Sequence, residues 1–467
     1  MLGIVGVVLS LALLMVLAYR GFNVLVLAPL MATVAVVFAS APILANYTEV
    51  YLPALAKYIG QYMPVFLLGA IFGKGMDDSG AARAIARAIV SKLGAQRAIL
   101  AVVVACAILT YGGVSLFVVA FAVFPIAVNL FKEADLPFRL IPATIALGSF
   151  TFTMTALPGR PQIQNAIPTP FFGTDAFAAP GIGIIAAAIM FGGGMWWLLR
   201  RAASAAKKGE TFADTASRRF EEPRQGSGAE GTTLAGPPPV WLAMLPLVVV
   251  IVVNLILVRL VYPMLDFAYL ERFDGKTIDD VAGIWALTTA LLVAILLLFG
   301  TMGRRMDSAK KTLNEGSFAS MLPLFNTASE VGYGAVIAAL PAFATIRDAV
   351  LGISTNPTVS VAVATNILAG ITGSSSGGMS ITLNTLGEQF RQMAEQQGIS
   401  LDLLHRITAL AAGSFDTLPH SGAVITLLTI TGMTHRKAYA DVAMCTIVFP
   451  LISATVAVAL GATVGSF

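Results

Sequence analysis

Two ionisable side chains lie within strongly apolar stretches of the sequence, each near a proline. Arg160 falls in LPGRPQIQNAIP, residues 157–168, and Asp416 falls in SFDTLPHSG, residues 414–422. An ionised residue at the centre of a membrane helix costs about 2.5–3.5 kcal/mol even on insertion scales, so each needs a function or a partner. Arg160 could bind an anionic substrate through two parallel hydrogen bonds. Alternatively, it binds carbonyls freed by a helix break or snorkels to the membrane interface.

Asp416 and His420 are four residues apart and flank a Leu-Pro pair. Either could carry a coupled proton, and histidine titrates nearest to neutral pH. Asp416 could instead cap the half-helix that follows it by accepting hydrogen bonds from the first amides. Glu330 lies in an apolar segment and is a further candidate proton site, with a buried structural ion pair as the alternative. We interpret His405 and His435 as ordinary residues near the ends of spans.

Small and polar residues cluster where the apolar runs are interrupted. Residues 374–378 form a Ser-Gly tip, which lets backbone amides approach an anion at the start of a half-helix. Gln164 and Asn165 carry carboxamides that suit the orientation of hydroxy-acid groups. The alternative is that such side chains only satisfy backbone groups at helix breaks. The predicted substrate-binding residues are Tyr111, Gly112, Gly113, Ser115, Thr153, Thr155, Arg160, Gln162, Gln164, Asn165, Ser374, Ser375, Ser376, Gly377, Gly378, Thr417 and Ser421.

The composition indicates that a lipid bilayer surrounds these residues. Hydrophobic residues make up 57% of the chain and charged residues only 12%. Soluble domains carry about 25% charged residues, so most of this surface must face lipid. A length of 467 residues allows about ten spans of roughly 20 residues each. The small net charge of +4 gives no indication of nucleic-acid binding.

Charge placement predicts an orientation for the spans. The positive-inside rule places the Lys- and Arg-rich segments in the cytoplasm, and the acidic loop 262–284 and both termini then lie outside. The basic segments are residues 83–97, 200–224, 304–311 and 435–437. The continuous spans that we expect are residues 2–19, 22–40, 58–72, 181–199, 241–262, 284–300 and 442–464.

Four further apolar stretches contain glycines, prolines or serines that interrupt a helix. Non-helical backbone at membrane depth is tolerated only where protein or a water-filled cavity satisfies it, so four such places in one chain indicate a site. We predict two re-entrant hairpins, at residues 98–131 and 359–386, and two broken helices, at residues 140–178 and 403–431.

Short motifs recur at an offset of about 260 residues, which indicates an internal duplication. GSF at 148–150 precedes a Leu-Pro pair, and GSF at 413–415 does the same. We predict an all-α polytopic fold of two repeats, residues 1–200 and 240–467, joined by a flexible cytoplasmic linker over 201–239. Five crossings and one hairpin in each repeat would insert the second copy upside down, an arrangement that recurs among secondary transporters.

Four stretches resemble the gluconate permease (GntP) family of the ion transporter superfamily. They are TYGGVSLFVVAFAVFPIA, TALPGRPQIQNAIPTPFFGT, TGSSSGGMSI and SFDTLPHSGAVITLLTITGMTHRKAYAD, at residues 110–127, 155–174, 372–381 and 414–441. The resemblance implies proton-coupled uptake of a small organic acid across the bacterial inner membrane, without a cofactor. The superfamily resemblance also implies a homodimer, in which a transport domain moves as an elevator against a scaffold domain.

The break motifs ALPGRPQIQN and FDTLPH differ from those of the gluconate-transporting members. The chain therefore resembles the related permeases, and 3-hydroxybutyrate is as good a candidate substrate as gluconate. A channel, or an uncoupled or sodium-coupled facilitator, is the alternative function. An enzyme, an ATP-driven pump or a metal site is not expected, since the sequence has no P-loop, no nucleophile elbow and no zinc-type cluster. Cys106 and Cys445 are expected to be buried thiols.

Overall fold

The computed structural model describes residues 2–20, 22–114, 116–215, 238–273, 277–419 and 421–467. The described residues form helices joined by turns, and none of them lies in a β-strand. This finding confirms the predicted all-α class. Ser115 and His420, two of the predicted site residues, lie outside the described residues.

Long apolar helices indicate a membrane protein. Helices that are apolar on every face are typical of spans surrounded by lipid and other helices. The described residues contain five helices long and apolar enough to cross a membrane: Ile43–Asp78, Pro180–Lys207, Val240–Met264, Val281–Arg305 and His435–Thr463. Shorter apolar helices are Leu2–Leu14, Val24–Phe38, Ala98–Tyr111, Pro357–Thr372 and Gly422–Thr431. The count of about ten spans and the orientation of both termini stay predictions.

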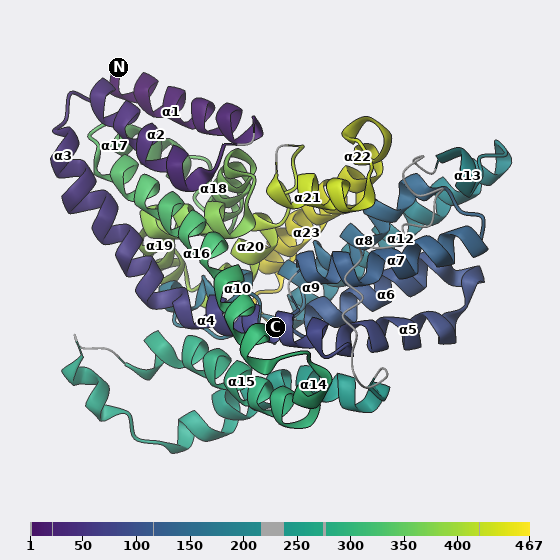
Figure 1. Ribbon diagram of the computed structural model, residues 1–467. Coiled ribbons are helices and arrows are strands. Elements are labelled where there is room, and N and C mark those ends of the chain that lie inside the picture. The colour runs from purple at the N-terminus through teal and green to yellow at the C-terminus, as the bar shows by residue number, and fades with distance from the viewer. Residues whose placement is uncertain (1, 21, 115, 216–237, 274–276, 420) are drawn as a thin grey trace.

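One group of helices consists of α16 (Ala309–Ala339) and helices linked to it directly or through a neighbouring helix (Figure 1). This helix lies along α4 (Leu52–Asp78) and α2 (Val24–Phe38), and α1 (Leu2–Tyr19) covers α2. The other members of the group are α3 (Ile43–Ala45), α14 (Val240–Ile256), α15 (Ile278–Met302) and α17 (Phe343–Leu351).

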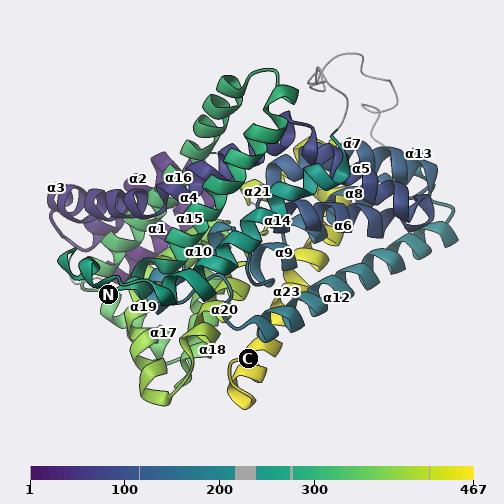
Figure 2. The ribbon, with the colours of Figure 1, turned by 90° about the horizontal axis from the view of Figure 1, so that it is seen from below.

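The remaining helices form a second group, in which α12 runs beside α23 (Figure 2). This group contains the interrupted segments. Its members are α5 (Ala81–Leu93), α6 (Ala98–Tyr111), α7 (Leu116–Glu133), α8 (Ile141–Ser149), α9 (Phe152–Thr155), α10 (Ile163–Ala166), α11 (Thr169–Phe172), α12 (Pro180–Lys207), α13 (Phe212–Thr215), α18 (Pro357–Thr372), α19 (Ser375–Gln397), α20 (Leu401–Ala412), α21 (Gly422–Thr431), α22 (His435–Ala443) and α23 (Phe449–Thr463).

All four predicted interruptions are breaks between helices. The chain reverses between α6 and α7 near Gly113, which has φ +99°, and between α18 and α19 at Gly373, which has φ +65°. Glycine adopts such left-handed values without the strain that a Cβ would add. The first broken helix consists of α8 to α11, and the second consists of α20 and α21. The re-entrant placement of the two hairpins in the membrane stays a prediction.

The basic segment 83–97 is largely a helix. Residues Ala81–Leu93 form α5, which packs its alanines inward while Arg87 and Lys92 stay exposed. Alanine has the highest helix propensity, so an Ala-rich segment with periodic Arg is typical of an amphipathic helix.

The expectation of a flexible linker is wrong for the part before residue 216. Helix α12 continues to Lys207, and Arg139 Nε then contacts Glu210 Oε1 at 2.6 Å. The hydrogen bond from Arg139 holds the pKa of Glu210 below its usual range. Arg139 and Arg201 also pair with the buried carboxylate of Asp441, at 2.8 and 2.7 Å. Ion pairs therefore order this part of the chain, and residues 216–237 lie outside the described residues.

Candidate functional site

The tip of the first hairpin is tied to the first broken helix. Tyr111 Oη donates a hydrogen bond to the carbonyl of Pro158 at 2.9 Å. Gln162 Nε2 donates to the carbonyl of Thr110 at 3.0 Å. Two predicted site residues therefore hold the Gly112 tip against the proline-rich break.

The second hairpin tip joins both broken helices. Gln164 Nε2, from the first break, donates to Ser375 Oγ at 3.0 Å. On the other side of the tip, Gly370 of α18 lies against the second break, because a Cβ added there would be 3.2 Å from Phe415 Cβ. Because Ser375 is the first residue of α19, the N-terminus of this helix lies at the junction of the second tip and both breaks.

Arg160 is fully buried within the first break. Its Nη1 atom donates to the Thr153 carbonyl at 2.7 Å, whereas its Nε and Nη2 atoms have no partner among the described residues. The full burial contradicts the snorkelling alternative. One nitrogen thus satisfies a freed carbonyl, and two remain available to a ligand.

Glu330 reaches the second tip from α16. Its side chain is 3% exposed, and a Cβ added at Gly377 would overlap its carboxylate. The described residues provide no ion-pair partner for Glu330, and its Oε2 atom is unpaired among them. Thr327, one turn earlier on α16, contacts Ser376 of the tip at 3.4 Å between hydroxyl oxygens. The structural ion pair considered for Glu330 is therefore absent from the described part of the chain.

Unpaired buried polar atoms concentrate at these interruptions. Most buried polar groups in proteins are hydrogen-bonded, and each one left unpaired costs about 1–3 kcal/mol. A group of such atoms in an apolar interior indicates a place that water, an ion or a ligand fills. The unpaired atoms in and beside the interruptions are Thr110 Oγ1, Arg160 Nε, Arg160 Nη2, Gln164 Oε1, Glu330 Oε2, Asp416 Oδ1 and Ser421 Oγ.

A buried His-Arg pair on α20 is a part of the site that the sequence reading missed. Arg406 is fully buried and donates to the carbonyl of Ala178 from Nε at 3.0 Å and from Nη2 at 2.8 Å. Its Nη1 atom donates to Asn165 Oδ1 at 3.2 Å. This geometry fixes the carboxamide of a predicted site residue. An arginine within the apolar run 403–431 was the available signal.

The expectation that His405 is an ordinary residue at the end of a span is wrong. His405 is fully buried, and its Nε2 atom donates to Asn165 Oδ1 at 3.2 Å. Its Nδ1 atom then accepts from the Thr174 hydroxyl at 2.6 Å. His435, in contrast, is exposed and contacts the carbonyl of Pro419 at 2.8 Å.

Comparisons of the sequence with known proteins identify a transporter family. Residues 2–461 match the family model described as GntP family permease. The chain is 44% identical to the uncharacterized transporter YxjC of Bacillus subtilis strain 168. The 450 aligned residues cover 95% of each chain. The chain belongs to the GntP permease family. It is therefore a membrane transporter, and the family resemblance of the sequence is confirmed.

Several predicted site residues of this permease direct their hydroxyls at helix backbone or at a neighbouring helix. Thr153 Oγ1 donates to the Gly148 carbonyl at 2.8 Å, and Thr155 Oγ1 donates to the Thr151 carbonyl at 3.3 Å. Thr417 Oγ1 donates to Thr446 Oγ1 at 2.7 Å. The contacts of these three hydroxyls agree with the alternative given above, in which polar side chains satisfy neighbouring groups near a break and do not bind substrate.

The remaining residues of the second tip are committed to its own structure. Ser374 caps α19, because its hydroxyl accepts from the Gly377 amide at 3.1 Å. Gly378 packs so closely on α18 that a Cβ would overlap the backbone of Ala369. The small residues therefore allow close helix contact at the tip, whether or not they also admit a ligand.

Proposed function

We propose that this permease is a secondary active transporter that takes up a small organic acid together with a proton across the bacterial inner membrane. The substrate is a hydroxy or sugar acid such as gluconate or 3-hydroxybutyrate. The observation that carries the proposal is the set of unpaired buried donors and carboxylates around the second tip and the two breaks.

An anion is the ligand that the donors favour. Arg160 offers two free nitrogens, in the planar arrangement that binds a carboxylate through parallel hydrogen bonds. The N-terminus of α19 adds a partial positive charge, since the helix dipole and the first amides point toward a bound anion. Gln164 bonds Ser375 through Nε2 and keeps Oε1 free for a substrate hydroxyl.

A proton is the coupling ion that the acceptors favour. Asp416 is 6% exposed and Glu330 is 3% exposed, and the described residues give neither carboxylate an ion pair. A charge buried without a counter-ion is costly, and protonation removes that cost. We assign the coupled proton to Asp416, because this buried carboxylate lies within the second break and its Oδ1 atom has no partner among the described residues. His420 stays an alternative carrier of that proton, and Glu330 stays a second candidate.

The proposed mechanism is an elevator motion of the second helix group against the first, within a homodimer. The spacing of the breaks supports the inverted repeats, since the α6–α7 and α18–α19 reversals are about 260 residues apart. The two repeats would then be residues 1–200 and 240–467, joined by the linker 201–239. The contact between Glu330 on α16 and Gly377 on α19 lies between the two groups.

Uptake into proteoliposomes tests the proposal. Purified protein is screened with C3–C6 hydroxy and sugar acids, with and without an imposed pH gradient, and sodium is replaced by potassium in a parallel series. We expect an inward proton gradient to drive accumulation of at least one acid without sodium. Uptake that persists at the same level after the gradient collapses would instead support the uncoupled facilitator. Uptake that requires sodium would support the sodium-coupled one.

A further inference from the structure

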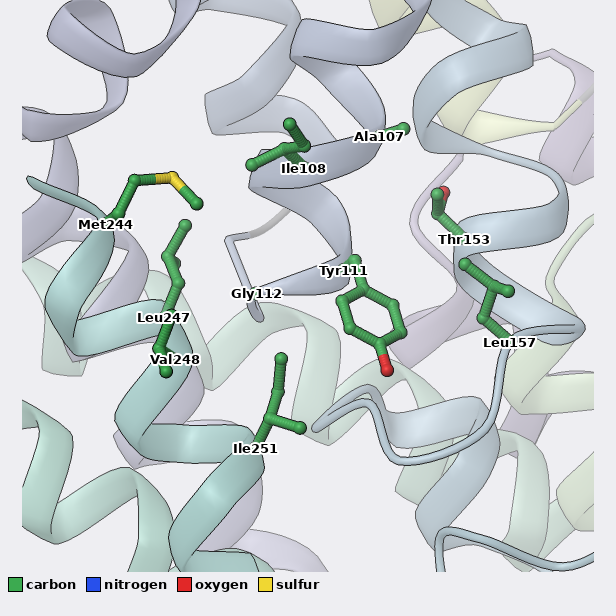
Figure 3. Close-up of a pocket in the computed structure, with 10 residues that line it drawn as sticks. All are labelled: Ala107, Ile108, Tyr111, Gly112, Thr153, Leu157, Met244, Leu247, Val248 and Ile251. Carbon is green, nitrogen blue, oxygen red and sulfur yellow. The ribbon is translucent and has the colours of Figure 1, made fainter. Parts of the chain in front are cut away.

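An apolar cavity of about 300 Å³ lies between α14 and the first hairpin. Figure 3 shows the side chains of α14 on one side of this space and those of α6 and the first break on the other. The cavity therefore lies beside the place where the first tip meets α14. Its lining residues are Ala107, Ile108, Tyr111, Gly112, Thr153, Leu157, Met244, Leu247, Val248 and Ile251.

The polar side chains in this lining already have partners. Tyr111 Oη donates to the Pro158 carbonyl, and Thr153 Oγ1 donates to the Gly148 carbonyl. The other eight lining residues have apolar side chains or none. A cavity without free donors or acceptors does not hold ordered water, and it binds apolar molecules instead. A carboxylate would lose its hydration there without compensation.

The mouth of the cavity faces the side of α14 that lipid must cover. Val248 lines the cavity and is 46% exposed, and Val252, one turn later, is 44% exposed. Both lie in the candidate span Val240–Met264, in which an 18-residue stretch has a mean hydropathy of 2.8. The exposed apolar face of this span therefore continues directly into the cavity, so the molecules that can enter from that side are bilayer lipids.

We infer that an acyl chain of a membrane phospholipid inserts into this cavity, between α14 and the tip of the first hairpin. An empty apolar cavity leaves its lining atoms without contacts on one side, and a hydrocarbon chain restores those dispersion contacts. Leu247 is in direct contact with the tip, because a Cβ added at Gly112 would overlap its side chain. The inserted chain abuts this contact and, under the transport mechanism proposed above, restrains movement of the first hairpin against α14.

Photo-labelling in liposomes tests the site. The full-length protein is reconstituted with a trace of phospholipid that carries a diazirine within its acyl chain, irradiated, and digested for peptide mapping. We expect label on α6 around Tyr111, behind the mouth of the cavity, in addition to label on the exposed face of α14. The measurement needs no transport, so its result is independent of the proposed function.

A matched pair of variants on α14 separates the cavity from the lipid-facing surface. Val248→Trp fills the cavity, and Val252→Trp adds the same side chain at an equally exposed position that does not line it. We expect the α6 label to be lost in Val248→Trp and retained in Val252→Trp. Ala107→Phe fills the cavity from the opposite wall and should give the same loss if Val248→Trp fails to fold.

Two results would overturn the inference. One is α6 labelling that is absent from the wild type or unchanged in both cavity-filling variants. The other is protection of α6 from the label by a saturating C3–C6 hydroxy acid, because this would assign the cavity to the substrate.

Discussion

The Glu330 carboxylate lies directly against the Cα atom of Gly377, across the interface between α16 and the first turn of α19. A methyl group at position 377 would therefore force the Glu330 carboxylate to move. This contact brings a buried acidic group to the positive end of a 23-residue helix. It also connects the two groups of helices at the tip where we place the substrate.

The first prediction concerns the space at this contact. Gly377→Ala should lower the free energy of unfolding by about 1–3 kcal/mol, the usual cost of overpacking a tight interior. Combining it with Glu330→Ala should remove that cost, since the overlapping carboxylate is gone. Thermal unfolding of the purified variants measures both, independently of transport.

Gly378→Ala is the matched control for this pair. A Cβ at Gly378 would overlap the backbone of Ala369, so Glu330→Ala should not relieve that clash. If Glu330→Ala left the cost of Gly377→Ala undiminished, the assigned contact would be wrong.

The second prediction concerns proton coupling at Asp416. Asp416→Asn is permanently neutral, so it can no longer exchange a proton during the transport cycle. We expect loss of accumulation driven by a pH gradient, while exchange of labelled for unlabelled substrate continues, because exchange moves no net proton. Both are measured by uptake into proteoliposomes. Full pH-driven accumulation in Asp416→Asn would move the assignment to His420 or Glu330.

The third prediction concerns the two free nitrogens of Arg160. Arg160→Lys keeps the charge but removes the planar pair of donors. Hydrogen bonds to charged groups contribute about 1.5–3 kcal/mol, so the apparent Km for uptake should rise about 10- to 100-fold. The exposed Arg200→Lys should leave Km unchanged. An unchanged Km in Arg160→Lys would mean that Arg160 only satisfies the Thr153 carbonyl.

The fourth prediction concerns Arg406, which holds backbone carbonyls and Asn165 in place. Arg406→Gln should leave buried acceptors unpaired, at a cost in the free energy of unfolding of about 1–3 kcal/mol for each. Arg436→Gln, on an exposed turn of α22, should be neutral. The measurement is the melting temperature of each variant in detergent, compared with that of the wild type. Equal melting temperatures would show that Arg406 has no positioning role.

The four interruptions could be predicted because their signals are local. Gly113 and Gly373 adopt left-handed backbone conformations at the two reversals, and the breaks combine proline with glycine and polar residues. Proline alone does not mark a break, since Pro64 and Pro323 lie inside the continuous helices α4 and α16. Helix α5 was not predicted, although its alanines and arginines all favour a helix, because the basic segment was used only to orient the spans.

The long-range contacts could not be predicted from residue spacing. Asn165 and His405 are 240 positions apart in the sequence, and no periodicity says that α20 turns its His-Arg pair toward the first break. Glu330 was recognised as a buried carboxylate, but its position against Gly377 depends on how α16 packs on α19. Such contacts between helices are set by tertiary packing, which a single sequence does not display.

The coupling of anion uptake to protons can be measured directly as a change in internal pH. Proteoliposomes loaded with a pH-sensitive dye are given the best hydroxy or sugar acid from the screen, without sodium and without an imposed gradient. The account predicts that the interior acidifies with wild-type protein, and not in empty liposomes or with Asp416→Asn. Uptake of labelled acid without acidification above the empty-liposome level would contradict it.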